Sequence, residues 1–130
     1  MLLAGCSTGM GGGSTASDKG MQYLLGRGVP QSDVKAFEYF KKAADEGDPF
    51  AENEIAYLYA TGKGTPRDKT KAFLYYQKAA QKGLVSAEYN LGLMYLHGIG
   101  TPPNRALAMQ WFRKSAGRGF EPAKQALSES

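Results

Sequence analysis

The chain has 130 residues, of which 42% are apolar, and sixteen Lys and Arg against twelve Asp and Glu give it a net charge of +4. This length suits one domain with a core of modest size, and the small basic excess favours acidic partners without requiring nucleic acid. A single cysteine, Cys6, excludes an intramolecular disulfide and a cysteine-cluster metal site. A single histidine, His97, excludes a zinc site built from paired histidines.

The N-terminal residues Leu3-Ala4-Gly5-Cys6 resemble a bacterial lipobox, in which the cysteine is lipidated. The following residues, STGMGGGSTAS, have the composition of a flexible tether, so residues 1–14 are interpreted as a lipobox remnant and Gly/Ser tether. The residue after the cysteine is Ser7 and not an aspartate, which resembles the pattern of bacterial lipoproteins that are located in the outer membrane. The basic start and the apolar run of about 7–15 residues typical of a signal peptide are missing, so we expect that most of the leader is absent from this sequence. The alternative is a free cysteine in a disordered tail.

A G-x-G turn followed by proline occurs three times, at residues 26–30, 62–66 and 98–102, with a spacing of 36 residues. Tyr23, Tyr59 and Tyr95 share that spacing. A glycine-rich turn of this kind can also cradle a phosphate, but no strand precedes it and the P-loop pattern is absent. The period therefore predicts tandem repeats over residues 15–50, 51–86 and 87–122.

Each repeat divides into two predicted helices. The first repeat begins with a short, polar helix over residues 15–25, and the later repeats begin with helices over 51–61 and 87–97. The second helices are predicted over 33–46, 69–82 and 105–118. Each of these follows a residue whose side chain can accept from the first free helix N–H groups, namely Ser32, Asp68 and Asn104. Residues 123–130 begin a fourth copy of the pattern, and we expect them to form a helix that caps the C-terminal end of the repeats.

The pattern of Ala87, Leu91, Gly92, Tyr95 and Gly98, with its counterparts in the other repeats, resembles the Sel1-like repeat, a relative of the tetratricopeptide repeat. The resemblance covers residues 15–127. It implies an all-α fold, an α/α solenoid that forms a right-handed superhelix with a concave side lined by the first helices. It also implies a non-catalytic scaffold or adaptor that binds a protein partner on that side.

Residues of the first helices outside the apolar face are candidates for the concave surface. In chain order, the candidates are Glu52, Asn53, Tyr57, Thr61, Glu88, Tyr89, Leu93, Leu96 and His97. We expect Asn53, Tyr57, Tyr89, Leu93 and His97 to form the partner-binding set, because exposed aromatic and aliphatic groups dominate interface energies. The alternative is that they pack against the next helix.

Charge is distributed unevenly, with net charges of −1, +3 and +2 in the three repeats. Basic side chains cluster around the middle turn, and an acidic partner or anionic lipid headgroups would suit them. A solvated surface turn is the alternative. This basic cluster consists of Lys63, Arg67, Lys69 and Lys71.

The sequence predicts no cofactor, no metal and no catalytic residue. Cysteine-rich Sel1-like proteins have been associated with β-lactam binding or hydrolysis, but the cysteine pair of each of their repeats is missing here. RNA binding is a further alternative, which the modest charge disfavours. We therefore expect a monomeric periplasmic protein, lipid-anchored through Cys6 to the outer membrane, that does not bind nucleic acid. Its role is that of an envelope scaffold or, alternatively, of an immunity protein against a secreted toxin.

Overall fold

The computed structural model describes residues 14–130, and Cys6 with the predicted tether lies outside them. This part of the chain folds into helices alone. They are α2 (Ala16–Leu25), α3 (Asp33–Asp45), α4 (Pro49–Thr61), α5 (Lys69–Gln81), α6 (Val85–His97), α7 (Arg105–Gly117) and α8 (Glu121–Ser128). The predicted all-α fold is confirmed. None of the helices in this region is long and apolar enough to cross a membrane.

The second helices begin at the residues that the capping pattern predicts. The side chains of Ser32, Asp68 and Asn104 each accept a hydrogen bond from the backbone N–H three residues later. The first helices begin two residues earlier than expected, at Pro49 and Val85. Proline suits the first turn of a helix, since that turn needs no N–H donor, and the Asp48 carboxylate caps it.

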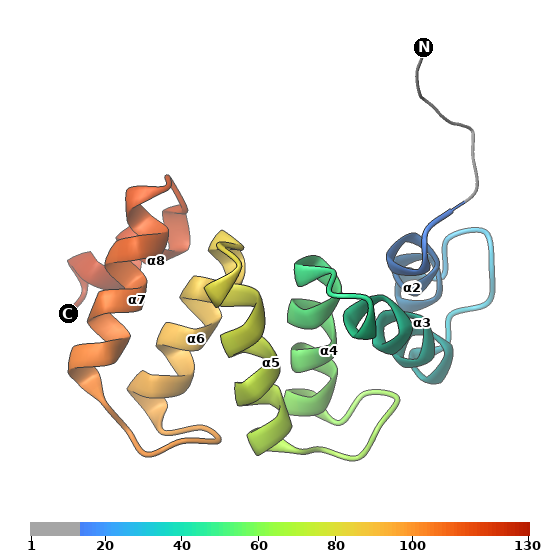
Figure 1. Ribbon diagram of the computed structural model, residues 1–130, viewed down its shortest axis with the longest axis horizontal. Coiled ribbons are helices and arrows are strands. Elements are labelled where there is room, and N and C mark those ends of the chain that lie inside the picture. The colour runs from blue at the N-terminus through green and yellow to red at the C-terminus, as the bar shows by residue number, and fades with distance from the viewer. Residues whose placement is uncertain (1–13) are drawn as a thin grey trace, which may run out of the picture.

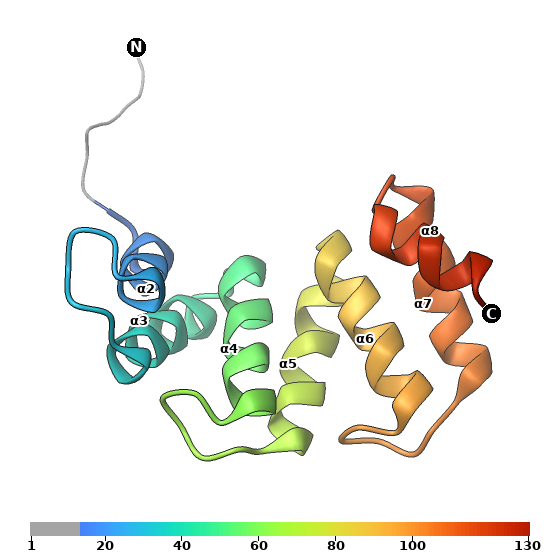
Figure 2. The ribbon, with the colours of Figure 1, turned by 180° about the vertical axis from the view of Figure 1, so that it is seen from behind.

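Consecutive helices pack side by side and form an α/α solenoid whose two ends are raised in Figure 1. The same order of helices is visible from behind in Figure 2. Helices α2, α4, α6 and α8 are the first helices of successive repeats, and we call them the first-helix row. Helices α3, α5 and α7 form the second-helix row. The short α8 extends the first-helix row beyond the third repeat.

The core lies between paired helices of the two rows. Its largest fully buried apolar side chains are Phe40, Ile55, Leu58, Leu91 and Phe112. Alanines surround them and allow close approach of the helices. The aromatic residues repeat with the sequence: Tyr23 stacks on Tyr39 with a centroid distance of 5.6 Å, and Tyr59 stacks on Tyr75 at 5.8 Å.

The second glycine of the turn joins neighbouring repeats. A Cβ atom at Gly64 would lie 2.2 Å from the carbonyl oxygen of Asp33, and one at Gly100 would lie 2.2 Å from that of Lys69. Both glycines also have positive φ, which side chains disfavour. Each turn therefore docks on the start of the second helix in the preceding repeat. At Gly28, in the first repeat, nothing among the described residues lies within 4 Å.

Candidate partner-binding surface

Three of the predicted surface residues lie on one face of α6. Tyr89, Leu93 and His97 are four residues apart, so their side chains point the same way from the helix. They line a groove of about 490 Å³ between α6, α7 and α8. The other residues around the groove are Leu96, Arg105, Met109, Phe112, Pro122, Gln125, Ala126, Glu129 and Ser130.

The ring of Tyr89 is held on one side of this groove. Its centroid lies 5.6 Å from that of Phe112 and 5.6 Å from that of Phe120. Tilted aromatic contacts of this kind fix a ring in place. Tyr89 is therefore half-buried. One part of its side chain lines the groove, and the other part packs against neighbouring rings.

Tyr57 lies one repeat away on the same row, at the position equivalent to Leu93. It is 40% exposed. The ammonium group of Lys63 lies 5.4 Å from the centre of its ring and 3.3 Å from its hydroxyl oxygen. Tyr57 is not among the residues that line the α6–α8 groove, so the predicted set is divided between two places on the first-helix row.

Asn53 does not have the exposure that we expected. It is only 8% exposed, and its side-chain oxygen accepts a hydrogen bond from the amide of Asn90 at 3.1 Å. Asn53 thus joins α4 to α6 within the first-helix row. A short polar side chain at this position is covered by the neighbouring helix, whereas the larger Tyr89 at the equivalent position reaches the surface.

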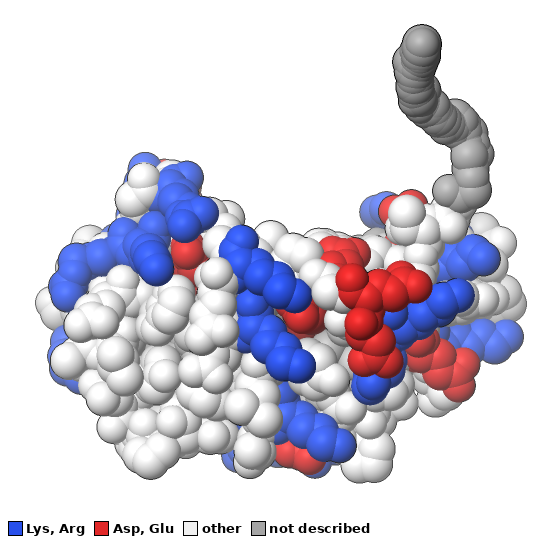
Figure 3. Space-filling model, in the orientation of Figure 1, with Lys and Arg blue, Asp and Glu red and all other residues white. Residues whose placement is uncertain are grey.

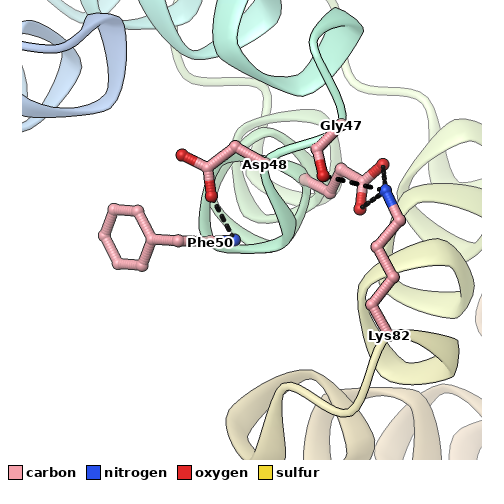
Figure 4. Close-up of polar contacts among 5 residues, drawn as sticks. Gly47, Asp48, Phe50 and Lys82 are labelled. Atoms are coloured by element: carbon pink, nitrogen blue, oxygen red, sulfur yellow. Dashed lines mark hydrogen bonds and ion pairs between the residues drawn. The ribbon is translucent and has the colours of Figure 1, made fainter.

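Glu52 and Glu88, also expected at the surface, are buried. Lys82 Nζ lies 2.8 Å from Glu52 Oε2 and donates to the carbonyl oxygen of Gly47 at 3.0 Å, as Figure 4 shows. Arg118 repeats the arrangement with Glu88, at 3.4 Å, and with the carbonyl oxygen of Gly83, at 3.1 Å. Each ion pair lies within one repeat, and the hydrogen bond from its basic side chain to the glycine carbonyl joins that repeat to the preceding one.

The same close-up shows how α4 begins beside this ion pair. The Asp48 carboxylate accepts from the backbone N–H of Phe50 at 3.0 Å (Figure 4). Its other oxygen accepts from the hydroxyl of Ser17, on α2. Asp48 thereby links two first helices, α2 and α4.

Helices α4 and α5 of the second repeat each carry a partly or fully buried ionisable group that the sequence pattern did not single out. Burial raises the pKa of the Glu54 carboxyl, and a hydrogen bond from Asn53 opposes part of that rise. Burial also raises the pKa of the Tyr76 hydroxyl, with smaller contributions from Glu54 and Tyr57. Glu54 and Tyr76 stand at positions where other repeats carry Asn90 or Phe112, and this departure from the repeat is the signal that could have found them.

Within residues 14–130, no group of three or more His, Cys, Asp or Glu side chains could hold a metal ion. His97 is exposed and lines the groove as the chain's single histidine. The surface offers apolar contact and a few polar groups, which is the composition of a recognition site.

Comparisons with known proteins identify the repeats. A model of the Sel1 repeat matches residues 20–48, 49–84 and 85–120. The chain is similar to the crystal structure of a Sel1 repeat protein from Oxalobacter formigenes, with 36% identity over 88% of this chain and 86% of that one and a TM-score of 0.80. Among curated protein sequences, none matches.

Two further solved structures share the fold. One is c5321, a protective antigen of uropathogenic Escherichia coli with an SLR fold, at 33% identity over 77% of this chain and 21% of that one (TM-score 0.76). The other is the cysteine rich protein B of Helicobacter pylori, at 26% identity over 79% and 77% (TM-score 0.72). Sel1 repeats generally mediate protein–protein interaction, and proteins that carry them are typically non-catalytic scaffolds. With three matched repeats and this structural agreement, the chain belongs to the Sel1 repeat family.

Proposed function

We propose that the protein is a non-catalytic adaptor that holds a protein partner on its first-helix row. The observation that carries this proposal is the groove lined by Tyr89, Leu93 and His97. Leu93 and Met109 supply apolar contact, while Arg105 and Glu129 supply charges of opposite sign. A concave site that combines apolar side chains with polar groups and few charges suits an amphipathic segment of a partner, such as one face of a helix.

Tyr57 extends this surface into the second repeat. An exposed aromatic ring contributes strongly to binding when a partner covers it. Because Tyr57 and Leu93 occupy equivalent positions in adjacent repeats, a partner segment that follows the first-helix row would contact both. The buried Asn53 is not part of the proposed contact surface.

We propose further that the protein acts in the bacterial envelope, facing the periplasm, with a lipid on Cys6 that anchors it to the outer membrane. The support is the lipobox-like segment Leu3-Ala4-Gly5-Cys6. A neighbour of the same fold is a protective antigen of uropathogenic Escherichia coli, and a location in the envelope fits that description. Two or more acyl chains would give stable anchoring, because each buried CH₂ adds about 0.8 kcal/mol of membrane affinity.

The partner proposal is tested by affinity capture from the bacterial envelope, identification by mass spectrometry and titration calorimetry with the purified partner. Leu93→Asp and Tyr57→Ala are expected to weaken binding by at least about tenfold, since each removes an apolar contact from the surface. Val34→Asp is the matched control, because Val34 is 56% exposed on α3 in the other row. Equal binding by the Leu93 variant and the wild type would contradict the proposal.

The identity of the partner decides between the two roles. A structural protein of the envelope supports the scaffold. A secreted toxin that loses its activity when the protein binds it would instead establish the immunity role. Measurable hydrolysis of nitrocefin by the purified protein would contradict the non-catalytic assignment.

The anchor is tested separately by cell fractionation. The full-length protein is expected in the outer-membrane fraction of its source bacterium. Cys6→Ser should move it to the soluble periplasmic fraction, because no acyl chain is attached. Retention of the serine variant in the membrane fraction would show that Cys6 is not the anchor.

A further inference from the structure

A second groove lies between α3 and α5 of the second-helix row, with one residue of α4 also in its lining. Its volume is about 490 Å³. Lys41, Lys71 and Lys78 line it together with the rings of Tyr59 and Tyr75 and the side chain of Leu74. It shares no lining residue with the groove of the first-helix row.

Two of the three lysines carry charge that no acid balances. Lys41 Nζ lies 2.8 Å from the Asp45 carboxylate, and this hydrogen bond raises the pKa of Lys41. Lys71 and Lys78 form no ion pair with any residue of 14–130. In Figure 3 basic side chains lie along α5, and acidic ones gather beside them where α3 leads into α4. The free charges in the groove are therefore positive.

Aromatic rings position both lysines. Lys71 Nζ lies 5.5 Å from the centre of the Tyr59 ring, and Lys78 Nζ lies 5.1 Å from that of Tyr75. The two rings stack on each other with an interplanar angle of 13°. Cation–π contacts of this kind hold the ammonium groups near the rings. The groove thus combines an aromatic surface with two positioned cations.

The spacing along α5 defines what could bind. Lys71, Leu74 and Lys78 lie three and four residues apart and share one helix face. Seven residues of helix separate the two lysines by about 10.5 Å along the axis. Leu74 lies between them and is 48% exposed, which leaves an apolar contact unused.

We propose that the α3–α5 groove binds an acidic segment of a partner protein in the polyproline II conformation. In that conformation residues three apart lie on the same side, about 9 Å from each other. Two carboxylates with this spacing match Lys71 and Lys78, and a proline between them contacts Leu74 and the tyrosine rings. Aromatic-lined grooves bind proline-containing segments in this way. The amides of Gln77 and Gln81, which also line the groove, can bond to the backbone of the segment.

The equivalent positions in the other repeats lack this combination. In the first repeat they are Lys35, Glu38 and Lys42, so an acid stands between the two lysines. In the third they are Leu107, Gln110 and Lys114, so one lysine is missing. Two lysines with an apolar residue between them occur at α5 alone among the described repeats. A flat anionic membrane would not require this arrangement within a groove.

The test uses the full chain and a short fluorescent peptide that carries two glutamates three positions apart with a proline between them. Fluorescence anisotropy is expected to show saturable binding. Lys71→Leu, which copies Leu107 of the next repeat, and Lys78→Gln should each weaken binding about tenfold, because each removes one charge-assisted contact. Leu74→Ser should weaken it about threefold. A peptide with glutamines in place of the glutamates should not bind.

Arg27→Gln is the matched control, because it removes one positive charge in the turn between α2 and α3, outside the groove. Its peptide affinity should equal that of the wild type, and thermal unfolding should show that every variant is folded. An equal loss of peptide affinity in the Arg27 variant would show that net charge alone causes the weaker binding, and it would overturn the proposal. Absence of peptide binding, or binding only to phosphatidylglycerol vesicles, would also overturn it.

Discussion

The ammonium group of Lys82 lies 2.8 Å from the buried carboxylate of Glu52, thirty residues earlier in the chain. Lys82 caps the end of α5, and Glu52 lies in the first turn of α4. A third group, the carbonyl oxygen of Gly47, accepts from the same ammonium. One lysine therefore pairs with a buried charge of its own repeat and bonds to a backbone carbonyl of the preceding repeat.

Lys82→Met should lower the free energy of unfolding by about 2 kcal/mol, because it leaves the Glu52 carboxylate buried without its partner. Urea unfolding followed by circular dichroism measures the change. Lys42→Met, at an exposed position of α3, is the control and should change stability by less than about 0.5 kcal/mol. A similarly small loss for the Lys82 variant would show that the buried carboxylate does not depend on the ion pair.

The equivalent ion pair of the third repeat, between Glu88 and Arg118, should tolerate the replacement of both partners without a large loss of stability. Glu88 is fully buried, its nearest approach to Arg118 is 3.4 Å, and neither of its oxygens has a hydrogen-bond partner among the described residues. Exchange of a buried pair for apolar residues is often neutral or stabilising. Glu88→Leu combined with Arg118→Leu should therefore retain the wild-type stability within about 1 kcal/mol.

Arg118→Leu alone provides the contrast, because it leaves the Glu88 carboxylate uncompensated. It should cost at least about 2 kcal/mol in the same urea titration. If the double variant is less stable than this single variant, the pair contributes more to stability than its geometry indicates.

Gly92→Ala should destabilise the protein by about 1–3 kcal/mol, because the added methyl group overpacks the core. Its Cβ would lie 2.6 Å from Cε1 of Phe112, whose side chain is fully buried. Gly117→Ala is the matched control within a helix, since no atom of the described residues lies within 4 Å of its Cβ position. The control should raise stability by about 0.5–1 kcal/mol through helix propensity. Equal melting temperatures for the two variants would contradict the packing account.

Glu54 should make stability depend on pH. Its pKa in the folded protein is raised above the ordinary value of 4.5 by burial, so the folded state binds the proton more tightly than the unfolded state. Stability from this group is therefore greatest below pH 4.5 and is lost as the pH rises through the folded pKa. Glu54→Gln should be more stable than the wild type at neutral pH and equal to it in acid.

Urea unfolding over a pH series compares the two proteins. The exposed Glu38→Gln serves as the control for loss of one carboxylate from a helix. A Glu54→Gln advantage that does not change with pH would show that proton binding is not its cause.

The sequence was sufficient to predict most of the fold, because the same chemistry recurs every 36 residues. Capping by Ser32, Asp68 and Asn104 and the glycine turns placed the second helices to within one residue of their observed ends. The predicted surface was less accurate. Tyr89, Leu93 and His97 lie together in a groove, whereas Asn53 is buried.

The errors have a common physical origin. A polar side chain on a first helix is exposed unless a partner from another helix, distant in the sequence, covers it, and no local pattern reports that partner. Asn53 is covered because Asn90 bonds to it, and Glu52 because Lys82 reaches it across thirty residues. The sequence did hold one signal for these ion pairs. Lys82 and Arg118 are basic residues at equivalent positions, and each follows a glutamate by thirty residues.

Gly64 and Gly100 each pack against the second helix of the preceding repeat, so the contacts between repeats depend on the order of the repeats along the chain. Each of these glycine turns requires a second helix that precedes it in the chain, whereas nothing in residues 14–130 lies within 4 Å of a Cβ position at Gly28. During synthesis the ribosome releases the N-terminal repeat first, so every later turn meets a contact surface that already exists. The chain can therefore add one repeat at a time as it emerges, and an incomplete chain presents only a surface on which the next repeat will dock.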